Sequence, residues 1–168
     1  MRASSDWSRA VHGVLRAQDV RQIGYVPDGG LKRLIALARA DKAMRAVPLT
    51  TEEEGIALAT GAWLGGERCA VLMQSSGVGN CINMLGMAIE CRIPLLMIVT
   101  MRGQWGEFNP WQLPMAQSSS AVLGAIGVIV QCVDQEADIA TNVDAAARMA
   151  FNSNRVVAVQ IAQRAIGT

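Results

Sequence analysis

Short apolar runs alternate along this chain with longer segments in which apolar residues recur at every third or fourth position. A short apolar run indicates a buried strand, and the longer spacing indicates a helix with one apolar face. The runs predict strands at 23–26, 45–47, 69–73, 95–100, 128–133 and 156–161. The spacing predicts helices at 8–17, 31–39, 82–90, 120–126 and 136–151, with one more beginning near residue 52.

Strands that alternate with helices are typical of an α/β fold. We therefore expect a three-layer αβα fold whose middle layer is a six-stranded, mainly parallel sheet. Neither a linker nor a repeat divides the chain, so residues 1–168 are expected to form a single domain. Functional groups in such folds gather where the strands end. The loops with unusual polar content are 27–30, 48–54, 74–80 and 101–117. The last of these belongs to a long irregular segment that we expect at 101–119.

Composition narrows the class of protein. Of 168 residues, 51% are hydrophobic and 17% are charged, which excludes a disordered tail and leaves apolar surface for partner subunits. A net charge of +1 without a basic block argues against nucleic acid as a partner. No apolar run approaches the length of a membrane span, and the first residues lack the apolar core of a signal peptide. We expect a cytoplasmic protein that does not bind membranes.

Cysteine and histidine usage excludes several kinds of site. Cys69, Cys81, Cys91 and Cys132 show neither a CxxC motif nor a zinc-binding spacing. They are expected to be buried, reduced thiols of a cytosolic protein. His12 is the one histidine and lies in a helical segment, where a structural role is the usual one. This argues against a Ser-His-Asp triad and against a His-rich metal site.

The loop at 74–80 is rich in glycine and serine and joins a strand to a helix. Such a loop can present backbone N–H groups to an anion. It is not a Walker loop, because Lys-Ser/Thr is missing, and Ile82 replaces the third glycine of a GxGxxG motif. A turn that packs the helix closely against its strand is an equal alternative.

Three consecutive glutamates, Glu52, Glu53 and Glu54, precede a largely apolar helix. Acids that interact with the helix dipole are the plain interpretation, and Thr50 and Thr51 each match a capping box with the glutamate three residues later. Because the helix is so apolar, at least one glutamate should point into a protected site or interface. A buried carboxyl group without a cation stays protonated or shares a proton with a ligand nitrogen.

Two further features have both structural and functional interpretations. Asp28 follows Pro27 at the end of the first expected strand, where composition alone favours a turn residue. The aromatic-rich segment after Arg102 is typical either of an active-site loop or of a subunit contact.

Together these loops carry a set of strings in a fixed order. They are Tyr25-Val-Pro-Asp28, Thr51-Glu-Glu-Glu-Gly55, Gly61-Ala62, Leu72-Met-Gln-Ser-Ser-Gly77-Val-Gly-Asn80, Asn83, Ile93-Pro-Leu-Leu, Arg102-Gly103 and Gly106-Glu107. The set resembles the alpha subunits of sulfopyruvate decarboxylase, with phosphonopyruvate decarboxylase as a single-chain relative. The resemblance runs from about residue 20 to the C-terminus, and the combination of strings is more specific than any one of them.

The resemblance implies the pyrimidine-binding fold of thiamine-diphosphate enzymes. In that family a glutamate nine residues before a glycine hydrogen-bonds N1′ of the aminopyrimidine, and counting back from Gly61 gives Glu52. Glu53 and Glu54 are then neighbours with capping or interface roles. The resemblance makes Asp28 the candidate acid for proton steps.

By the same resemblance, further positions line the cofactor and the substrate. The expected cofactor-binding residues are Glu52, Gln74, Ser75, Ser76, Gly77 and Asn80. Arg102 and Asn83 are the candidates for holding the substrate, although a structural arginine next to the core is an equal interpretation of Arg102. The implied substrate is 3-sulfopyruvate, which would yield sulfoacetaldehyde and CO₂; phosphonopyruvate or another short anionic 2-oxo acid is the alternative.

The sequence also departs from the family pattern. It lacks the Gly-Asp-Gly motif and following Asn that hold Mg²⁺ and the diphosphate. We therefore expect a beta subunit to supply Mg²⁺ ligands and the diphosphate site, with homo-association as well. Thr51 stands where relatives often carry Arg, and Pro114-Met-Ala-Gln replaces a loop that contains glycine. A non-catalytic ligand-binding or regulatory module of the same fold is the alternative from another class, and Glu52 argues against it.

Overall fold

The computed structural model describes residues 6–166. Its strands are β1 (Val20–Tyr25), β2 (Arg45–Pro48), β3 (Arg68–Gln74), β4 (Leu95–Thr100), β5 (Ile129–Val133) and β6 (Val156–Ile161). Its α-helices are α1 (Trp7–Ala17), α2 (Lys32–Ala40), α3 (Glu52–Leu64), α4 (Val78–Glu90), α5 (Leu113–Ala125), α6 (Ile139–Ser153) and α7 (Gln163–Ile166). Short 3₁₀ turns are η1 (Ser75–Gly77), η2 (Pro110–Gln112) and η3 (Glu136–Asp138).

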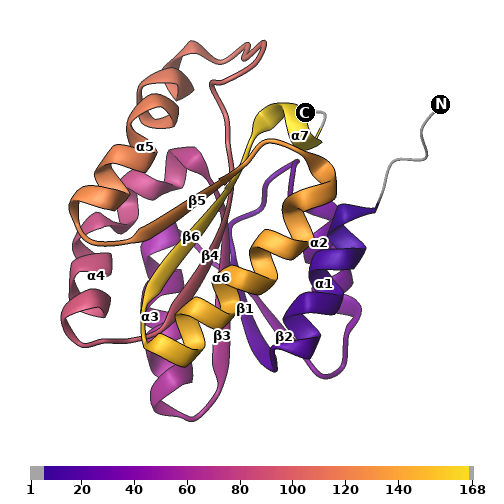
Figure 1. Cartoon of the computed structure of the whole chain (residues 1–168), viewed down its shortest axis with the longest axis vertical. Helices are drawn as coiled ribbons and strands as arrows, with labels where there is room; N and C mark the ends of the chain where they lie inside the picture. Colours follow the sequence, from indigo (N-terminus) through magenta and orange to yellow (C-terminus); the bar gives the residue numbers. More distant parts are fainter. Residues whose placement is uncertain (1–5, 167–168) are drawn as a thin grey trace.

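All six strands are parallel and lie in the order β2-β1-β3-β4-β6-β5. Helices α1, α2 and α6 pack on one face of the sheet, and α3, α4 and α5 pack on the other (Figure 1). The expected three-layer αβα fold is therefore confirmed. The chain moves outward from β1 to β2 and then continues on the other side of β1 with β3. In α/β folds, ligands bind in the crevice outside the carboxyl ends of the strands at such a reversal, which here are the ends of β1 and β3.

The sheet divides the hydrophobic core into two clusters. Successive strand residues point to opposite faces, so Ala70 and Leu72 of β3 join the α1/α2/α6 cluster, while Val71 and Met73 join the α3/α4 cluster. Every residue of β4 and β6 is buried. The apolar run at 95–100 predicted this for β4, because a central parallel strand is covered on both faces. Strand β6 is covered in the same way although it contains the polar Gln160.

The largest correction concerns the segment after β4. We expected 101–119 to be irregular with a helix at 120–126, but η2 begins at Pro110 and α5 at Leu113. Pro114 lies in the first turn of α5, where the lack of an N–H group costs nothing. Ser118 and Ser119 bond back to the carbonyls of Pro114 at 2.8 Å and Ala116 at 3.2 Å, so two of the hydroxyls that interrupt the apolar pattern are satisfied inside the helix.

Other boundaries differ by smaller amounts. The stretch 74–80 is not one loop, because β3 ends at Gln74, η1 follows, and α4 begins at Val78 rather than Ile82. Strand β1 starts three residues earlier than predicted, at Val20, because its polar Gln22 is buried and bonded to Glu67. The segment predicted as one helix at 136–151 is η3 followed by α6, which ends at Ser153.

The cysteine prediction was half right. All four thiols are free, and Cys69 and Cys81 are buried, but Cys91 and Cys132 are exposed. Cys91 follows the last residue of α4, and Cys132 lies on the edge strand β5, so an apolar run did not imply a covered side chain. His12 has a structural contact, with Nε2 lying 3.0 Å from Asp41 Oδ2.

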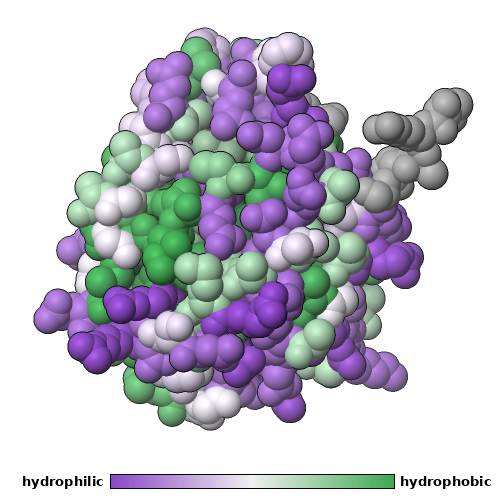
Figure 2. Space-filling model, in the orientation of Figure 1, coloured by the Kyte–Doolittle hydropathy of each residue, from purple (hydrophilic) through white to green (hydrophobic). Residues whose placement is uncertain are grey.

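The surface on the face shown in Figure 1 is mixed. Hydrophilic side chains intersperse with apolar ones, and an apolar area lies on the left, where β5 forms the edge of the sheet (Figure 2). None of the helices within residues 6–166 has the length and apolar character needed to cross a membrane.

Candidate active site

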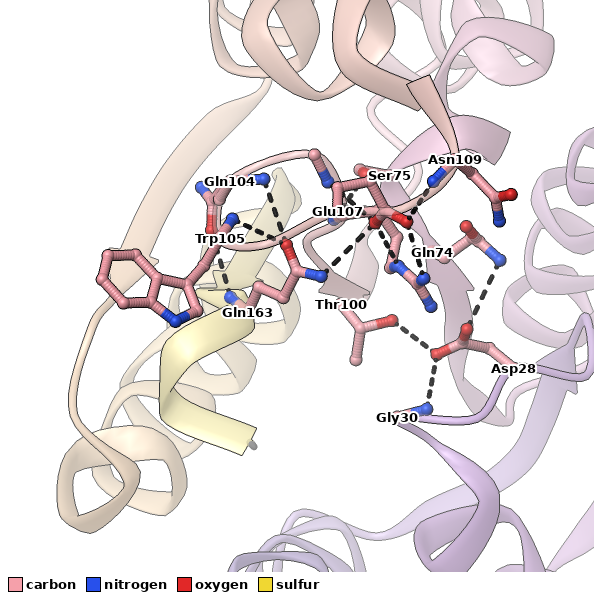
Figure 3. A network of polar contacts seen from close by, with 12 residues as sticks. Asp28, Gly30, Gln74, Ser75, Thr100, Gln104, Trp105, Glu107, Asn109 and Gln163 are labelled. Carbon is pink, nitrogen blue, oxygen red and sulfur yellow. Dashed lines mark hydrogen bonds and ion pairs between the residues drawn. The ribbon is translucent and has the colours of Figure 1, made fainter. Parts of the chain in front are cut away.

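Three strand ends bring polar side chains together at the crevice. Asp28 follows β1, Gln74 ends β3 and Thr100 ends β4 (Figure 3). Asp28 Oδ2 accepts hydrogen bonds from Thr100 Oγ1 at 2.8 Å and from the Gly30 backbone N–H at 3.0 Å. Asp28 Oδ1 accepts from Gln74 Nε2 at 3.3 Å. The carboxylate is therefore fixed across the crevice rather than free in a turn.

Gln74 has a second feature of interest. Its Nε2–H donates to Asp28. Its Oε1 is buried and has no hydrogen-bond partner within residues 6–166. A buried acceptor without a partner costs free energy unless a ligand or water donates to it. The crevice thus offers an acceptor, Gln74 Oε1, next to a carboxylate, Asp28.

Glu52 begins α3, and only 8% of its surface is exposed. Its Oε2 accepts a hydrogen bond from Asn80 Nδ2 at 2.8 Å. Its carboxyl group also lies directly over Gly77, where an added Cβ would come within 2.2 Å of Glu52 Cδ. Only glycine at position 77 leaves room for this carboxylate.

A buried thiol lies beside the Gly77 position that Glu52 covers, since Cys81 Sγ donates to the Gly77 carbonyl at 3.5 Å. Cys81, one turn after Gly77, is buried, and burial raises the pKa of its thiol to about 12. The charges of Glu52 and Glu53 contribute further to that rise. A carboxylate beside a buried, neutral thiol has few partners of its own, which suits a group that forms a hydrogen bond with a ligand.

The neighbouring glutamates lie outside the buried site, since Glu53 and Glu54 are exposed. Glu54 Oε2 accepts the backbone N–H of Thr50, the residue before the N-cap, at 2.7 Å. Neither predicted capping box forms, because the N-cap residue Thr51 makes no side-chain capping hydrogen bond and Glu54 bonds Thr50 rather than Thr51.

Arg102, directly after buried Met101, forms a two-point ion pair with Glu107. Arg102 Nε lies 2.8 Å from Glu107 Oε2, and Nη2 lies 3.1 Å from Oε1. The Arg102 backbone N–H donates to Ser75 Oγ at 3.0 Å. The Arg102 guanidinium and the backbone N–H groups of Asn109 and Gly103 hold the pKa of Glu107 down, at about 2, although burial opposes this.

A clamp from the C-terminal side fixes the same loop (Figure 3). Gln163 Oε1 accepts the backbone N–H groups of Gln104 at 3.1 Å and Trp105 at 3.0 Å. Gln104 Oε1 in turn accepts the Gln163 backbone N–H at 3.1 Å. The ordered loop leaves three aromatic side chains exposed, at 61% for Trp105, 78% for Phe108 and 67% for Trp111.

The segment from Gln74 to Asn80 connects these parts. Gln74 contacts Asp28, Ser75 contacts Arg102, and Gly77 and Asn80 contact Glu52. Most of the residues singled out in the sequence therefore gather around one segment. The exceptions are Ser76 and Asn83; Ser76 lies within η1, and Asn83 is exposed on α4.

Sequence reasoning missed three contributors to this site. No sign of a role for Thr100 or Gln163 was visible in the sequence. Thr100 is simply the last residue of an apolar strand, and Gln163 comes shortly after another such strand. Glu107 was noticed only as part of a Gly-Glu string, without a role. Within residues 6–166, no three His, Cys, Asp or Glu side chains gather in a way that suits a metal ion.

Comparison with known proteins shows the family to which the chain belongs. The model of the family described as "Thiamine pyrophosphate enzyme, N-terminal TPP binding domain" matches residues 6–112. The chain belongs to this family. The matched region contains Asp28, Glu52, the 74–80 segment and the Arg102–Glu107 pair.

Curated relatives give a narrower comparison. The "Sulfopyruvate decarboxylase subunit alpha" of Methanothermobacter thermautotrophicus is 32% identical over 92% of this chain and 94% of the relative. The protein of that name from Methanococcus maripaludis is 38% identical over 72% of this chain and 73% of the relative. The "Phosphonopyruvate decarboxylase" of Streptomyces viridochromogenes is 40% identical over 52% of this chain, but only 22% of that protein is covered.

A solved structure supports the fold independently. The 2-oxoglutarate:ferredoxin oxidoreductase of Magnetococcus marinus superposes with a TM-score of 0.74 at 16% identity. It covers 95% of this chain, which corresponds to 29% of that longer protein. The thiamine pyrophosphate domain thus shares its fold with this neighbour.

Proposed function

We propose that this thiamine pyrophosphate domain is the alpha subunit of a decarboxylase that converts 3-sulfopyruvate to sulfoacetaldehyde and CO₂. In this reaction the bond between C1 and C2 breaks, CO₂ leaves, and a proton takes its place on C2. The observation that carries the proposal is the buried Glu52 carboxylate seated over Gly77. The names of the alpha-subunit relatives support the choice of substrate.

Several groups around Glu52 fit the pyrimidine end of thiamine diphosphate. Glu52 supplies a carboxylate that can share a proton with a ring nitrogen, and we assign that nitrogen as N1′. Gln74 Oε1 supplies a buried acceptor without a partner among the described residues, which suits an N–H donor on a ligand. Ser75, Ser76, Gly77 and Asn80 complete the cofactor-binding segment in this proposal.

The chemistry divides between the cofactor and this chain. When bound, thiamine diphosphate supplies a cationic ring that accepts the electron pair released as CO₂ leaves. Glu52 holds the proton at N1′ that sets the charge state of the pyrimidine. Asp28 is the proposed acid for proton steps, and Thr100, Gly30 and Gln74 fix its carboxylate in place for them.

The substrate carries two anionic groups, and Arg102 and Asn83 are the proposed contacts for it on this chain. The ion pair between Arg102 and Glu107 fits the structural interpretation of this arginine. We propose that Arg102 holds the substrate anion in addition. Asn83 lies three residues after Asn80 on α4, on the exposed surface near the proposed cofactor segment.

A partner must complete the site in this proposal. We infer a beta subunit that provides the diphosphate site and the ligands of Mg²⁺, with residues 1–168 as one pyrimidine-binding domain that also associates with its own kind. The term "subunit alpha" in the names of the relatives supports a partner. Free thiols at all four cysteines suit a reducing compartment, and we propose the cytoplasm.

Phosphonopyruvate is the second candidate substrate, favoured by the similarity to a phosphonopyruvate decarboxylase. The experiment that decides is a decarboxylation assay on the chain co-expressed with its partner, using thiamine diphosphate, Mg²⁺ and both substrates in parallel. The proposal expects CO₂ release that requires both chains and both cofactors and prefers sulfopyruvate. A preference for phosphonopyruvate would change the substrate, and the absence of turnover with any short 2-oxo acid would overturn the proposed function.

A further inference from the structure

The loop after β4 is organised around one buried carboxylate. The Glu107 side chain is 1% exposed and accepts hydrogen bonds from five N–H groups around it. The donors are Arg102 Nε at 2.8 Å, Arg102 Nη2 at 3.1 Å, Asn109 N at 3.1 Å, Gly103 N at 3.2 Å and Gln163 Nε2 at 3.3 Å. Three of these five donors lie outside Arg102, so the carboxylate is held in place independently of the arginine that it pairs with.

The pair determines which end of Arg102 is available. Glu107 occupies Nε and Nη2 of the guanidinium, so Nη1 is the nitrogen that the pair does not use. Arg102 is also the more exposed member, at 17% for its side chain. Asp28 contributes to the electrostatic environment of Arg102, which raises the pKa of the guanidinium after the larger effect of Glu107. The contacts of its neighbours place the arginine beside Asp28, because Thr100, two residues earlier, donates to Asp28 at 2.8 Å, and the Arg102 backbone N–H donates to Ser75, next to Gln74, at 3.0 Å.

A two-point pair fixes direction as well as distance. The planar guanidinium and the carboxylate match in a single plane, so holding one edge of the arginine aims the other. Gln163 and the backbone N–H groups of Gly103 and Asn109 in turn hold the carboxylate. Arg102 is thus prevented from turning toward solvent.

We propose that Glu107 is a positioning residue that directs Arg102 Nη1 toward the terminal anionic group of the substrate. The inference rests on the proposed function, because it concerns how the same site recognises its 2-oxo acid. Glu107 itself does not touch the substrate. Its contribution is to hold Arg102 in the orientation that binding requires.

The test must separate positioning from charge. Glu107→Gln removes a negative charge near the substrate as well as the pair, so it mixes the two effects. Glu107→Asp keeps the charge and withdraws the carboxylate by one methylene, which breaks the two-point contact. Arg102→Lys also keeps its charge and removes the planar edge. Glu90→Asp is the matched control, since Glu90 is exposed at the end of α4.

The measurement is KM and kcat for sulfopyruvate with the assembled enzyme. A lost or misaligned charge-assisted hydrogen bond that exists equally in ground and transition states raises KM by about tenfold and leaves kcat almost unchanged. We expect this result for Glu107→Asp and for Arg102→Lys, with the double variant no worse than Arg102→Lys alone. Glu90→Asp should match the wild type.

Contrary outcomes are equally definite. A fall in kcat without a rise in KM would show that Glu107 only maintains the loop, and wild-type constants in Glu107→Asp would show that its charge alone matters. Either result overturns the inference. If Glu107→Asp does not assemble, Arg102→Lys decides by the same two constants. Absence of turnover by the wild type would instead overturn the proposed function, and this inference with it.

Discussion

Gly77→Ala is the substitution that tests the Glu52 site by geometry alone. The backbone at Gly77 has φ −76° and ψ −15°, a conformation open to any residue, so alanine introduces no backbone strain. Its Cβ would lie 2.2 Å from Glu52 Cδ and 2.3 Å from Glu52 Oε1. Ordinary contact begins near 3.4 Å, so the carboxylate must move by about 1.2 Å.

That displacement sets the expected size of the effect. A misplacement of about 1 Å in a reacting or positioning group costs on the order of 100-fold in rate. The fold loses less, because Glu52 is the first residue of α3 and its side chain can turn away. Overpacking costs about 1–3 kcal/mol, and replacing a helical glycine returns about 0.5–1 kcal/mol.

The assay compares kcat/KM of the assembled enzyme with the free energy of unfolding of the isolated chain. The matched control is Gly13→Ala on α1, across the sheet, where an added Cβ meets nothing within 4 Å. Gly13→Ala should gain about 0.5–1 kcal/mol of stability and retain full activity. Wild-type activity in Gly77→Ala would refute the reasoning, because it would mean that the position of the Glu52 carboxylate does not matter.

Three further predictions concern stability and reactivity. Because the pKa of Glu107 is lowered from 4.5 to about 2, its pair stabilises the fold above pH 4.5 and loses this effect as the pH falls toward 2. Urea unfolding should therefore show Glu107→Gln to be less stable than wild type by about 3 kcal/mol at neutral pH, with a smaller gap in acid. Titration of the folded chain with a thiol reagent should label Cys91 and Cys132 rapidly and the two buried cysteines only on unfolding. Thr100→Val should lose about 1–3 kcal/mol in urea unfolding, because a buried donor to Asp28 is removed without a change of shape.

The sheet was readable from the sequence because its central strands are apolar on both faces. Strands β4 and β6 appear as largely apolar runs, and their predicted bounds match the structure. Strand β1 was cut short, since the buried Gln22 depends on Glu67 from a distant segment. Helix α5 was missed in its first turns for a similar reason, because hydroxyl bonds inside the helix are invisible to an apolar pattern.

The site was predictable where chemistry depends on local strings. The run of three glutamates stood out because it preceded an apolar helix, and the burial of Glu52 confirms that one of them points into a protected place. The choice of Glu52 among the three came from the family resemblance. The role of Gly77 could not be predicted from the sequence, because it depends on the contact between the starts of two helices in the folded chain. The same holds for Glu107 and Gln163, which lie 56 positions apart and meet only in the fold.

The central claim is that Glu52 enables the pyrimidine of the cofactor to activate the thiazolium ring. The most direct measurement is hydrogen–deuterium exchange at thiazolium C2 of thiamine diphosphate bound to the assembled enzyme, followed by NMR. Glu52→Gln should slow the exchange by about 10²- to 10⁴-fold, whereas Glu53→Gln, one residue away and exposed, should leave it near the wild-type rate. Exchange at the wild-type rate in Glu52→Gln would contradict the assignment of this site.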